Sequence, residues 1–245
     1  MLDNPGFSRR KFLQLAGLST LGAGMLNFDI GALSIAEAQA GPSTSVENGD
    51  QALNKLMEGN TRYIKEAISG HPGRTEERRI EVAEGQNPFA VILACADSRV
   101  APEVIFDQGI GDIFVVRVAG NIVNTANYGV LGSIEYGVLV LGAPLIMVLG
   151  HSRCGAVAGA IEALKKGTKF PGSINNIVTT IKPAVEAVKG QPGDFLQNSI
   201  LSNVKMGVNK LNGSAPVIAD MVKEGKVKIV GANYDLKTGE VKIFS

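Results

Sequence analysis

The chain has 245 residues, of which 45% are apolar and 19% are charged. This balance is typical of a folded globular protein and is too apolar for a disordered one. The net charge of only +1 disfavours nucleic acid or an anionic membrane as the main partner. The chain has two cysteines, Cys95 and Cys154, and two histidines, His71 and His151, which excludes a disulfide scaffold and a metal site built from three histidines of one chain.

The N-terminus has the pattern of an export signal. A charged segment that contains Arg9 and Arg10 precedes an uncharged, mildly apolar stretch over residues 12–28. That stretch is slightly too short to span a membrane, and small residues at 36–40 offer A-x-A-like cleavage sites. The arginine pair followed by Phe-Leu resembles a twin-arginine signal.

We therefore expect a signal peptide at residues 1–40 and a single mature domain at residues 41–245, which begins with an N-terminal helical arm. The twin-arginine resemblance implies export of the folded protein to a periplasm or a thylakoid lumen, with no stable membrane anchor after cleavage. Folding before export would let a metal site load in the reducing cytoplasm, before the thiols reach an oxidising compartment. An uncleaved amphipathic anchor is the alternative.

Helical and strand-like patterns alternate along the mature chain. In chain order they predict a helix at 51–68, strands at 89–96 and 113–119, a glycine-rich helix at 127–141, a strand at 144–149, helices at 155–166, 174–189, 195–211 and 217–223, a strand at 226–232 and an edge hairpin partner at 240–244. This order predicts an α/β fold with a mainly parallel central sheet flanked by helices and an edge strand near the C-terminus.

Two polar segments follow two of these buried strands. The first, at 95–99, reads CADSR, and the second, at 151–155, reads HSRCG. Because ligands gather at the carboxyl ends of parallel strands, we expect both cysteines and His151 at one edge of the sheet. His71 stands beside a proline in a segment that breaks the helical pattern, and is expected to be a solvated loop residue.

Two thiolates and one imidazole suit Zn2+ and leave a fourth, open position, which is typical of a catalytic site. His151 and Cys154 are three residues apart, so a tight turn can direct both at one ion, and a helix N-terminus after Cys154 favours its thiolate. Each residue also has a simpler interpretation: Cys95 as a buried cysteine, Cys95 and Cys154 as a disulfide, and His151 as the end of a strand.

Asp97 and Arg99 are two apart and share a face of an extended segment. The guanidinium would keep the carboxylate ionised, and the carboxylate could then accept a proton from water on the metal. Two thiolates make Zn2+ formally neutral, so a nearby acceptor would help to generate hydroxide. A salt bridge that only stabilises the turn is the alternative.

Five segments together resemble the β-class carbonic anhydrases. They are CADSRV at 95–100, FVVRVAGN at 114–121, IEYGV at 134–138, HSRCG at 151–155 and VGANYDLKTGEV at 230–241. The resemblance covers about residues 51–245 and implies reversible hydration of carbon dioxide to bicarbonate and a proton, with one Zn2+ per chain.

The resemblance also implies roles for residues. Cys95, His151 and Cys154 would bind zinc, whose hydroxide attacks carbon dioxide, and Asp97 with Arg99 would form the catalytic dyad. The expected substrate-binding residues are Gln86, Phe114, Tyr136 and Gly155. In the family the pocket is completed across a dimer, so the resemblance implies a homodimer or a higher homo-oligomer and lets Gln86, Phe114 and Tyr136 serve the neighbouring subunit.

Because it has Gln86, the chain resembles the plant-like branch of the family, whose site is open. Another branch closes its site by placing the aspartate on zinc, and uses a tryptophan three residues before the first cysteine, where this chain has Ile92. Arg117 stands at a bicarbonate-pocket position of that branch, so the closed form is the alternative. We expect the open site.

Three other functions remain open from the residues. Carbon disulfide or carbonyl sulfide could be hydrolysed on the same ligand set. A zinc-dependent oligomer could act as a scaffold without catalysis, although Asp97 and Arg99 argue against that. Cys95 and Cys154 could also form a redox pair.

Overall fold

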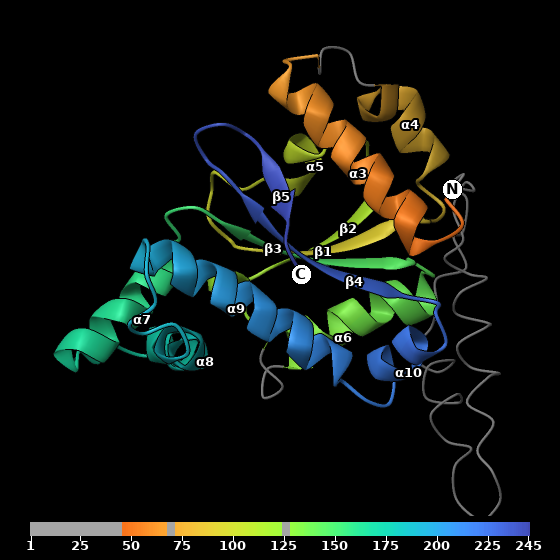
Figure 1. Ribbon diagram of the computed structural model, residues 1–245. Coiled ribbons are helices and arrows are strands. Elements are labelled where there is room, and N and C mark those ends of the chain that lie inside the picture. The colour runs from red at the N-terminus through yellow and green to blue at the C-terminus, as the bar shows by residue number, and fades with distance from the viewer. Residues whose placement is uncertain (1–45, 68–71, 124–127) are drawn as a thin grey trace, which may run out of the picture.

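The computed structural model describes residues 46–67, 72–123 and 128–245, so the expected signal peptide and His71 lie outside the described residues. Its centre is a five-stranded sheet in the order β2-β1-β3-β4-β5 (Figure 1). The strands are β1 Ala90–Ala94, β2 Ile113–Arg117, β3 Leu145–His151, β4 Lys228–Tyr234 and β5 Val241–Ile243. The first four run parallel and β5 is antiparallel to β4, which confirms the predicted fold class.

Helices of very different length connect the strands. They are α3 Gly49–Ile64, α4 Glu76–Glu81, α5 Pro102–Ile105, α6 Tyr128–Glu135, α7 Gly155–Lys166, α8 Ile174–Glu186, α9 Phe195–Asn212 and α10 Ile218–Lys223. Two single 3₁₀ turns, η1 Pro72–Arg74 and η2 Ala119–Asn121, and a wider π turn, η3 Tyr136–Val140, complete the list for the described residues. The sequence pattern did not predict α4 and α5, because elements this short show no helical period.

The sheet is covered on both faces, because each strand points alternate side chains to opposite sides. Figure 1 shows α3, α4 and α5 over one face and α6, α9 and α10 over the other. Ile92 packs with Leu56 of α3 in the first core, and Leu93 packs with Val204 of α9 in the second. All residues of β1 and β3 are buried, as expected for central parallel strands.

Several predicted boundaries shift by a few residues. The first helix begins at Gly49, because the Asn48 side chain accepts hydrogen bonds from the two backbone N–H groups at 50 and 51, and it ends at Ile64 rather than 68. The first strand ends at Ala94, so Cys95 lies just beyond it. The third strand continues to His151, because His151 still pairs with Tyr234 of β4.

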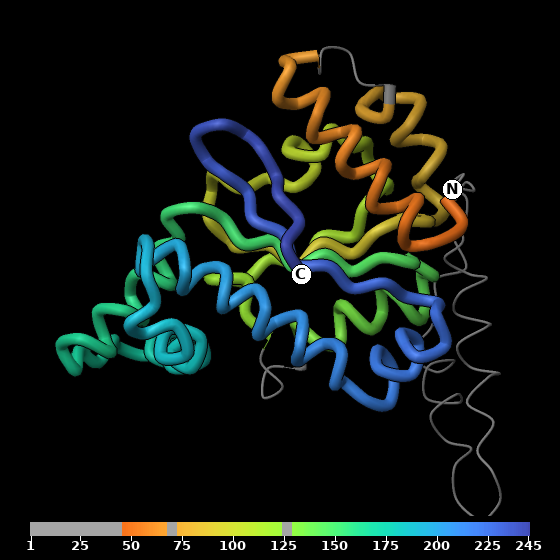
Figure 2. Tube along the Cα trace, in the orientation of Figure 1, coloured from red at the N-terminus to blue at the C-terminus, as the bar shows by residue number. Residues whose placement is uncertain are grey.

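The carboxyl ends of β1 and β3 lie side by side, since Ala94 pairs with Leu149. A third apolar cluster lies next to them and joins Cys95 and Cys154 to α7, α8 and α9. The tube in Figure 2 shows α7 and α8 beside one end of α9, and the C-terminus close to the sheet. Among the described residues, no helix is long and apolar enough to cross a membrane.

Candidate metal centre

Three potential metal ligands meet at this edge of the sheet. Cys95 follows β1, His151 ends β3, and Cys154 caps α7. Their ligand atoms all lie within 4.8 Å of one another, and all three residues are buried. Two sulfurs and one imidazole nitrogen in such a group are the donor set that Zn2+ takes in proteins.

A strained turn brings His151 and Cys154 together. Arg153 adopts the left-handed backbone conformation, with φ of 58°, and so reverses the chain between the two ligands. The turn is anchored to the neighbouring strand, because the Ser152 N–H donates to the Tyr234 carbonyl at 2.9 Å. The Ser152 Oγ in turn accepts from the Leu236 N–H at 3.0 Å.

The hydrogen bonds of His151 leave one ring nitrogen for a metal. Its Nδ1 lies 3.0 Å from the Ser152 carbonyl oxygen, which can only accept, so Nδ1 carries the proton. Its Nε2 is buried and has no hydrogen-bond partner among the described residues. A buried polar atom without a partner is costly, and a bound metal would remove that cost.

The two thiols share an environment that favours loss of a proton. The Cys154 thiol hydrogen-bonds to the Cys95 sulfur, which lowers the pKa of Cys95, and the Gly120 N–H adds a hydrogen bond to the same sulfur at 3.2 Å. The pKa of Cys154 is raised, first because its proton is held by that bond. Both cysteines are free, so a cation that displaces the shared proton would find two sulfur ligands.

Asp97 and Arg99 form a two-pronged ion pair beside the cluster. Arg99 Nε donates to Asp97 Oδ1 at 2.9 Å and Nη2 donates to Oδ2 at 2.7 Å, while the Arg99 backbone N–H also reaches Oδ1 at 3.0 Å. These hydrogen bonds, the side-chain ones first, hold the pKa of Asp97 well below its usual range. Asp97 Oδ2 lies 4.0 Å from His151 Nε2, so the carboxylate borders the space between the ligands.

Comparison with known proteins agrees with this geometry. The sequence profile of a family described as carbonic anhydrase matches residues 90–241. Carbonic anhydrase 2 of Mycobacterium tuberculosis is 41% identical over 192 residues, which are 77% of this chain and 89% of that protein. A carbonic anhydrase of Mycolicibacterium smegmatis is 39% identical over 194 residues, which are 79% and 92% of the two chains. The chain belongs to the carbonic anhydrase family.

The fold assigns it to the β class. The solved structure of the β-carbonic anhydrase CcaA superimposes with a TM-score of 0.63 and 26% identity, and covers 79% of this chain and 95% of that one. β-Carbonic anhydrases are zinc enzymes, and the buried Cys-His-Cys cluster with one unpartnered ring nitrogen fits that metal. Zinc is therefore the cofactor that the sequence predicted.

The Arg117 side chain of this carbonic anhydrase donates hydrogen bonds to two backbone carbonyls beside the cluster. Its Nε donates to the Cys95 carbonyl at 3.2 Å, and its Nη2 donates to the Asp97 carbonyl at 2.6 Å. The guanidinium thereby fixes the backbone between the first zinc-ligand candidate and the ion pair.

The expected substrate residues are not all near the cluster. Gly155 is the exposed first residue of α7, next to Cys154. Phe114 and Tyr136 form a ring pair with centroids 6.1 Å apart, but Phe114 pairs with Val91, four residues or roughly 13 Å before Cys95 along β1. Gln86 is half-buried in the segment that precedes β1, whereas Cys95 follows the other end of that strand.

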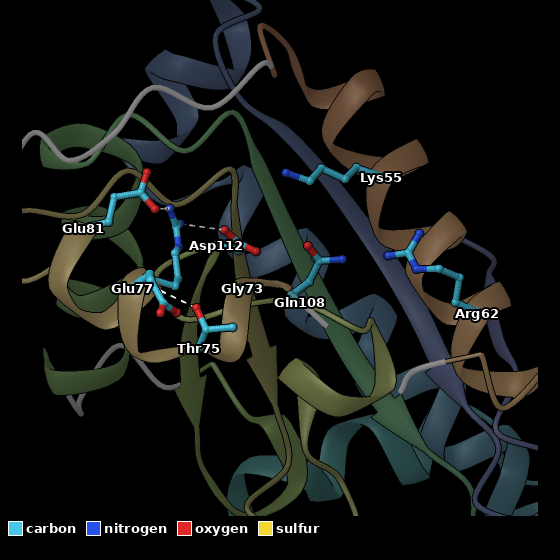
Figure 3. A pocket seen from close by; sticks show the side chains of 9 residues that line it. Lys55, Arg62, Gly73, Thr75, Glu77, Glu81, Gln108 and Asp112 are labelled. Atoms are coloured by element: carbon cyan, nitrogen blue, oxygen red, sulfur yellow. Dashed lines mark hydrogen bonds and ion pairs between the residues drawn. The ribbon is translucent and has the colours of Figure 1, made fainter. Parts of the chain in front are cut away.

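A cavity of about 610 Å³ lies elsewhere, between α3 and α4 (Figure 3). Figure 3 shows Lys55 and Arg62 projecting from α3 on one side, with Glu81 and Asp112 on the other. Arg78 is paired with both of those carboxylates at 2.9 Å. None of the cluster residues lines this cavity, so its size does not mark the reactive site.

Sequence reasoning missed two contacts of this centre. The first is the hydrogen bond from the Gly120 N–H to the Cys95 sulfur. Gly120 lies within FVVRVAGN, a segment that indicated the family but no role for this residue. The second is the hydrogen bond from Asn203 of α9 to the Gly120 carbonyl at 2.8 Å. The sequence signal that could have indicated it is a polar amide among the apolar residues on one face of that helix.

Proposed function

We propose that the chain catalyses the reversible hydration of carbon dioxide to bicarbonate and a proton at the Cys95, His151 and Cys154 cluster. The observation that carries the proposal is the buried, unpartnered Nε2 of His151, which faces two thiols and lies 4.0 Å from Asp97 Oδ2. When bound, zinc supplies a Lewis acid that makes water a nucleophile near neutral pH. Side chains of this protein accept the released proton and orient the group that accepts it.

Asp97 accepts the proton that the reaction releases. An ionised carboxylate can only accept, and the hydrogen bonds from Arg99 keep Asp97 ionised at any working pH. Oδ1 accepts hydrogen bonds from both the Nε and the backbone N–H of Arg99, whereas Oδ2 accepts one from Arg99 Nη2 and lies 4.0 Å from His151 Nε2. We assign proton acceptance to Oδ2, with Arg99 as the group that orients it.

The resting site is open, as in the plant-like branch. Two features support this: both oxygens of Asp97 are engaged by Arg99, and the Arg117 guanidinium is engaged by two backbone carbonyls. An aspartate that moved onto the metal would lose the two-pronged pair with Arg99, which is a strong form of hydrogen bond.

A second copy of the chain completes the substrate pocket with Gln86, Phe114 and Tyr136. Two observations support this arrangement. β2 is the edge strand of the sheet, and a groove of about 450 Å³ along it is lined by Phe114, Arg117 and Val130 among others. The aromatic pair and Gln86 also lie far from the cluster of their own chain, so an apolar wall suited to carbon dioxide requires a homodimer or a larger homo-oligomer.

Residues 1–40 form a twin-arginine signal that is removed on export to a periplasm or a thylakoid lumen. The support is the sequence pattern alone: an arginine pair, an uncharged stretch and small-residue exits. N-terminal sequencing of the protein recovered from the exported fraction would test it. We expect the mature chain to begin at Gly41, and replacement of Arg9 and Arg10 by lysine to leave the precursor uncleaved.

The activity itself is tested by carbon dioxide hydration of the zinc-loaded protein in strong buffer, from about pH 7 to about pH 9. Activity throughout this range is expected, and supports both the reaction and the open site. Activity only at the alkaline end would overturn the open site in favour of Asp97 on the metal. No activity with zinc present would overturn the reaction and favour a sulfur-containing substrate or a silent scaffold.

A further inference from the structure

A buried asparagine of α9 reaches the metal centre through one backbone residue. Asn203 is almost fully buried and its Nδ2 donates to the Gly120 carbonyl at 2.8 Å. Gly120 in turn donates its own N–H to the Cys95 sulfur at 3.2 Å. The two hydrogen bonds therefore meet at Gly120, on the peptide groups on either side of its Cα.

Gly120 is held in one backbone conformation. Its φ of 73° lies in the left-handed region, which glycine adopts without strain. A Cβ at this position would lie 2.7 Å from the Ile181 side chain and 3.1 Å from that of Ala156, so α7 and α8 close around the residue. The direction of its N–H is thus set by packing on one side and by Asn203 on the other.

The burial of the Asn203 side chain destabilises the folded protein. It lies between Ile200 and Val204, which belong to two apolar clusters, and its Oδ1 is buried without a hydrogen-bond partner among the described residues. A leucine of similar volume would fill this place without an unpaired polar atom. Stability alone does not explain an amide here, whereas its link to Gly120 does.

We propose that Asn203 is a positioning residue of the metal centre, which holds the Gly120 N–H on the Cys95 sulfur. The proposal rests on the proposed zinc site. A hydrogen bond to a thiolate withdraws electron density from the sulfur, so that a bound metal keeps more of its positive charge. This matters here because two thiolates already neutralise a divalent cation. Outer contacts of this kind typically tune both the affinity and the reactivity of a metal.

The test replaces zinc by Co2+, whose thiolate charge-transfer absorption reports the electron density on the sulfur ligands. In Asn203→Leu the Gly120 carbonyl loses its donor, and the direction of the N–H is held only by the packing of α7 and α8. We expect the charge-transfer band to move to lower energy. We also expect the affinity of the protein for zinc, measured by competition with a chelator, to be roughly 10- to 100-fold weaker than in the wild type.

Ser199→Ala is the matched control. Ser199 is also fully buried, lies one turn earlier on α9, and donates its hydroxyl to the Phe195 carbonyl of the same helix at 2.7 Å. A role of Asn203 in packing alone predicts that both variants leave the cobalt spectrum unchanged. We expect only Asn203→Leu to change it.

The outcomes separate this inference from the zinc site on which it rests. Absence of any thiolate band in wild-type protein treated with Co2+ would overturn the metal centre. A wild-type band that stays in place in Asn203→Leu would overturn only the role of Asn203. If that variant does not fold, the wild type decides: exchange of Zn2+ for Cd2+ must shift the amide resonance of Gly120, and an unmoved resonance would refute the proposal.

Discussion

The two ends of β1 serve the proposed reaction to very different degrees. At the carboxyl end, three potential metal ligands and the Asp97 and Arg99 pair lie together within a single chain. At the amino end, Gln86 is half-buried and Phe114 lies on an edge strand, and the one metal-ligand cluster found among the described residues is at the other end. Under the proposed function, one chain would therefore carry the whole reaction centre but only part of the substrate pocket.

The contrast has a physical origin in the sheet. Neighbouring strands lie about 4.8 Å apart, so residues that follow β1 and β3 meet without further elements. Residues that precede β1 are separated from this edge by the full length of the strand. The proposed function therefore places Gln86 at the metal centre of another copy of the chain.

Loss of a metal ligand is the largest effect we predict. His151→Ala removes the only nitrogen of the cluster, and we expect loss of stoichiometric zinc together with carbon dioxide hydration at the uncatalysed rate. Zinc content and hydration rate are measured on the same preparation. Met147→Leu, an equally buried change in the same strand, should retain both. Full activity in His151→Ala would contradict the assignment of the cluster.

Loss of the carboxylate should separate chemistry from metal binding. In Asp97→Asn the side chain no longer accepts a proton, so we expect zinc to stay bound while turnover falls by about 10²- to 10⁴-fold. Asp112→Asn is the control, because that carboxylate also pairs with an arginine, Arg78 at 2.9 Å, but lines the cavity between α3 and α4. Equal activities of the two variants would refute the role of Asp97.

The carboxyl end of the sheet was readable from the sequence for a simple reason. Buried strands are continuous apolar runs, and the polar segments CADSR and HSRCG interrupt them abruptly. The alternation of strands and helices then fixes a parallel sheet, and a parallel sheet brings the ends of its strands to one edge. Convergence of the two segments therefore required no knowledge of tertiary packing.

The surroundings of the centre were not readable in the same way. The left-handed conformation of Arg153, the hydrogen bonds of Arg117 and the reach of Asn203 to Gly120 all depend on tertiary packing between elements far apart in the chain. The wider π turn after α6 was also missed, because its apolar residues continue the helical pattern. The local sequence therefore indicates which residues are the ligands, whereas the contacts that orient them depend on tertiary packing.

Mixing subunits would test the incompleteness of the pocket. Gln86→Ala should lower activity roughly 10-fold through loss of one hydrogen bond to substrate, and Cys154→Ala should be inactive for want of metal. Refolded together in equal amounts, half of the dimers contain one chain of each kind. Each such dimer has one intact site if Gln86 acts across the interface.

The mixture should then recover about a quarter of wild-type activity, since a two-fold interface would pair Gln86 of each chain with the metal site of the other chain. If Gln86 acted within its own chain, the mixture would keep about a twentieth, half of the activity of Gln86→Ala. The recovered fraction therefore decides between the two arrangements. The unmixed variants, carried through the same refolding, are the controls.

The smallest predicted effect concerns the turn between β4 and β5, next to the metal end. Asp235 accepts hydrogen bonds from the backbone N–H groups of Thr238 at 2.8 Å and Lys237 at 2.9 Å. These bonds, that of Thr238 first, lower the pKa of Asp235. Asp235→Asn should cost up to about 1 kcal/mol of unfolding free energy at neutral pH, because it replaces charge-assisted bonds with neutral ones.

The sign of the pH dependence follows from the direction of that shift. A carboxyl whose folded pKa lies below its unfolded value stabilises the protein above the unfolded value, about 3.9, and loses this contribution as the pH falls through the folded pKa. The difference between wild type and Asp235→Asn in urea unfolding, at fixed protein concentration, should therefore shrink in acid, while zinc content at neutral pH stays unchanged. Glu58→Gln, an exposed change on α3, should show no such trend. If the difference in unfolding free energy between wild type and Asp235→Asn grew in acid, Asp235 would stabilise the hairpin in its protonated form. Loss of zinc from the variant would mean that this turn supports the metal centre as well as the hairpin.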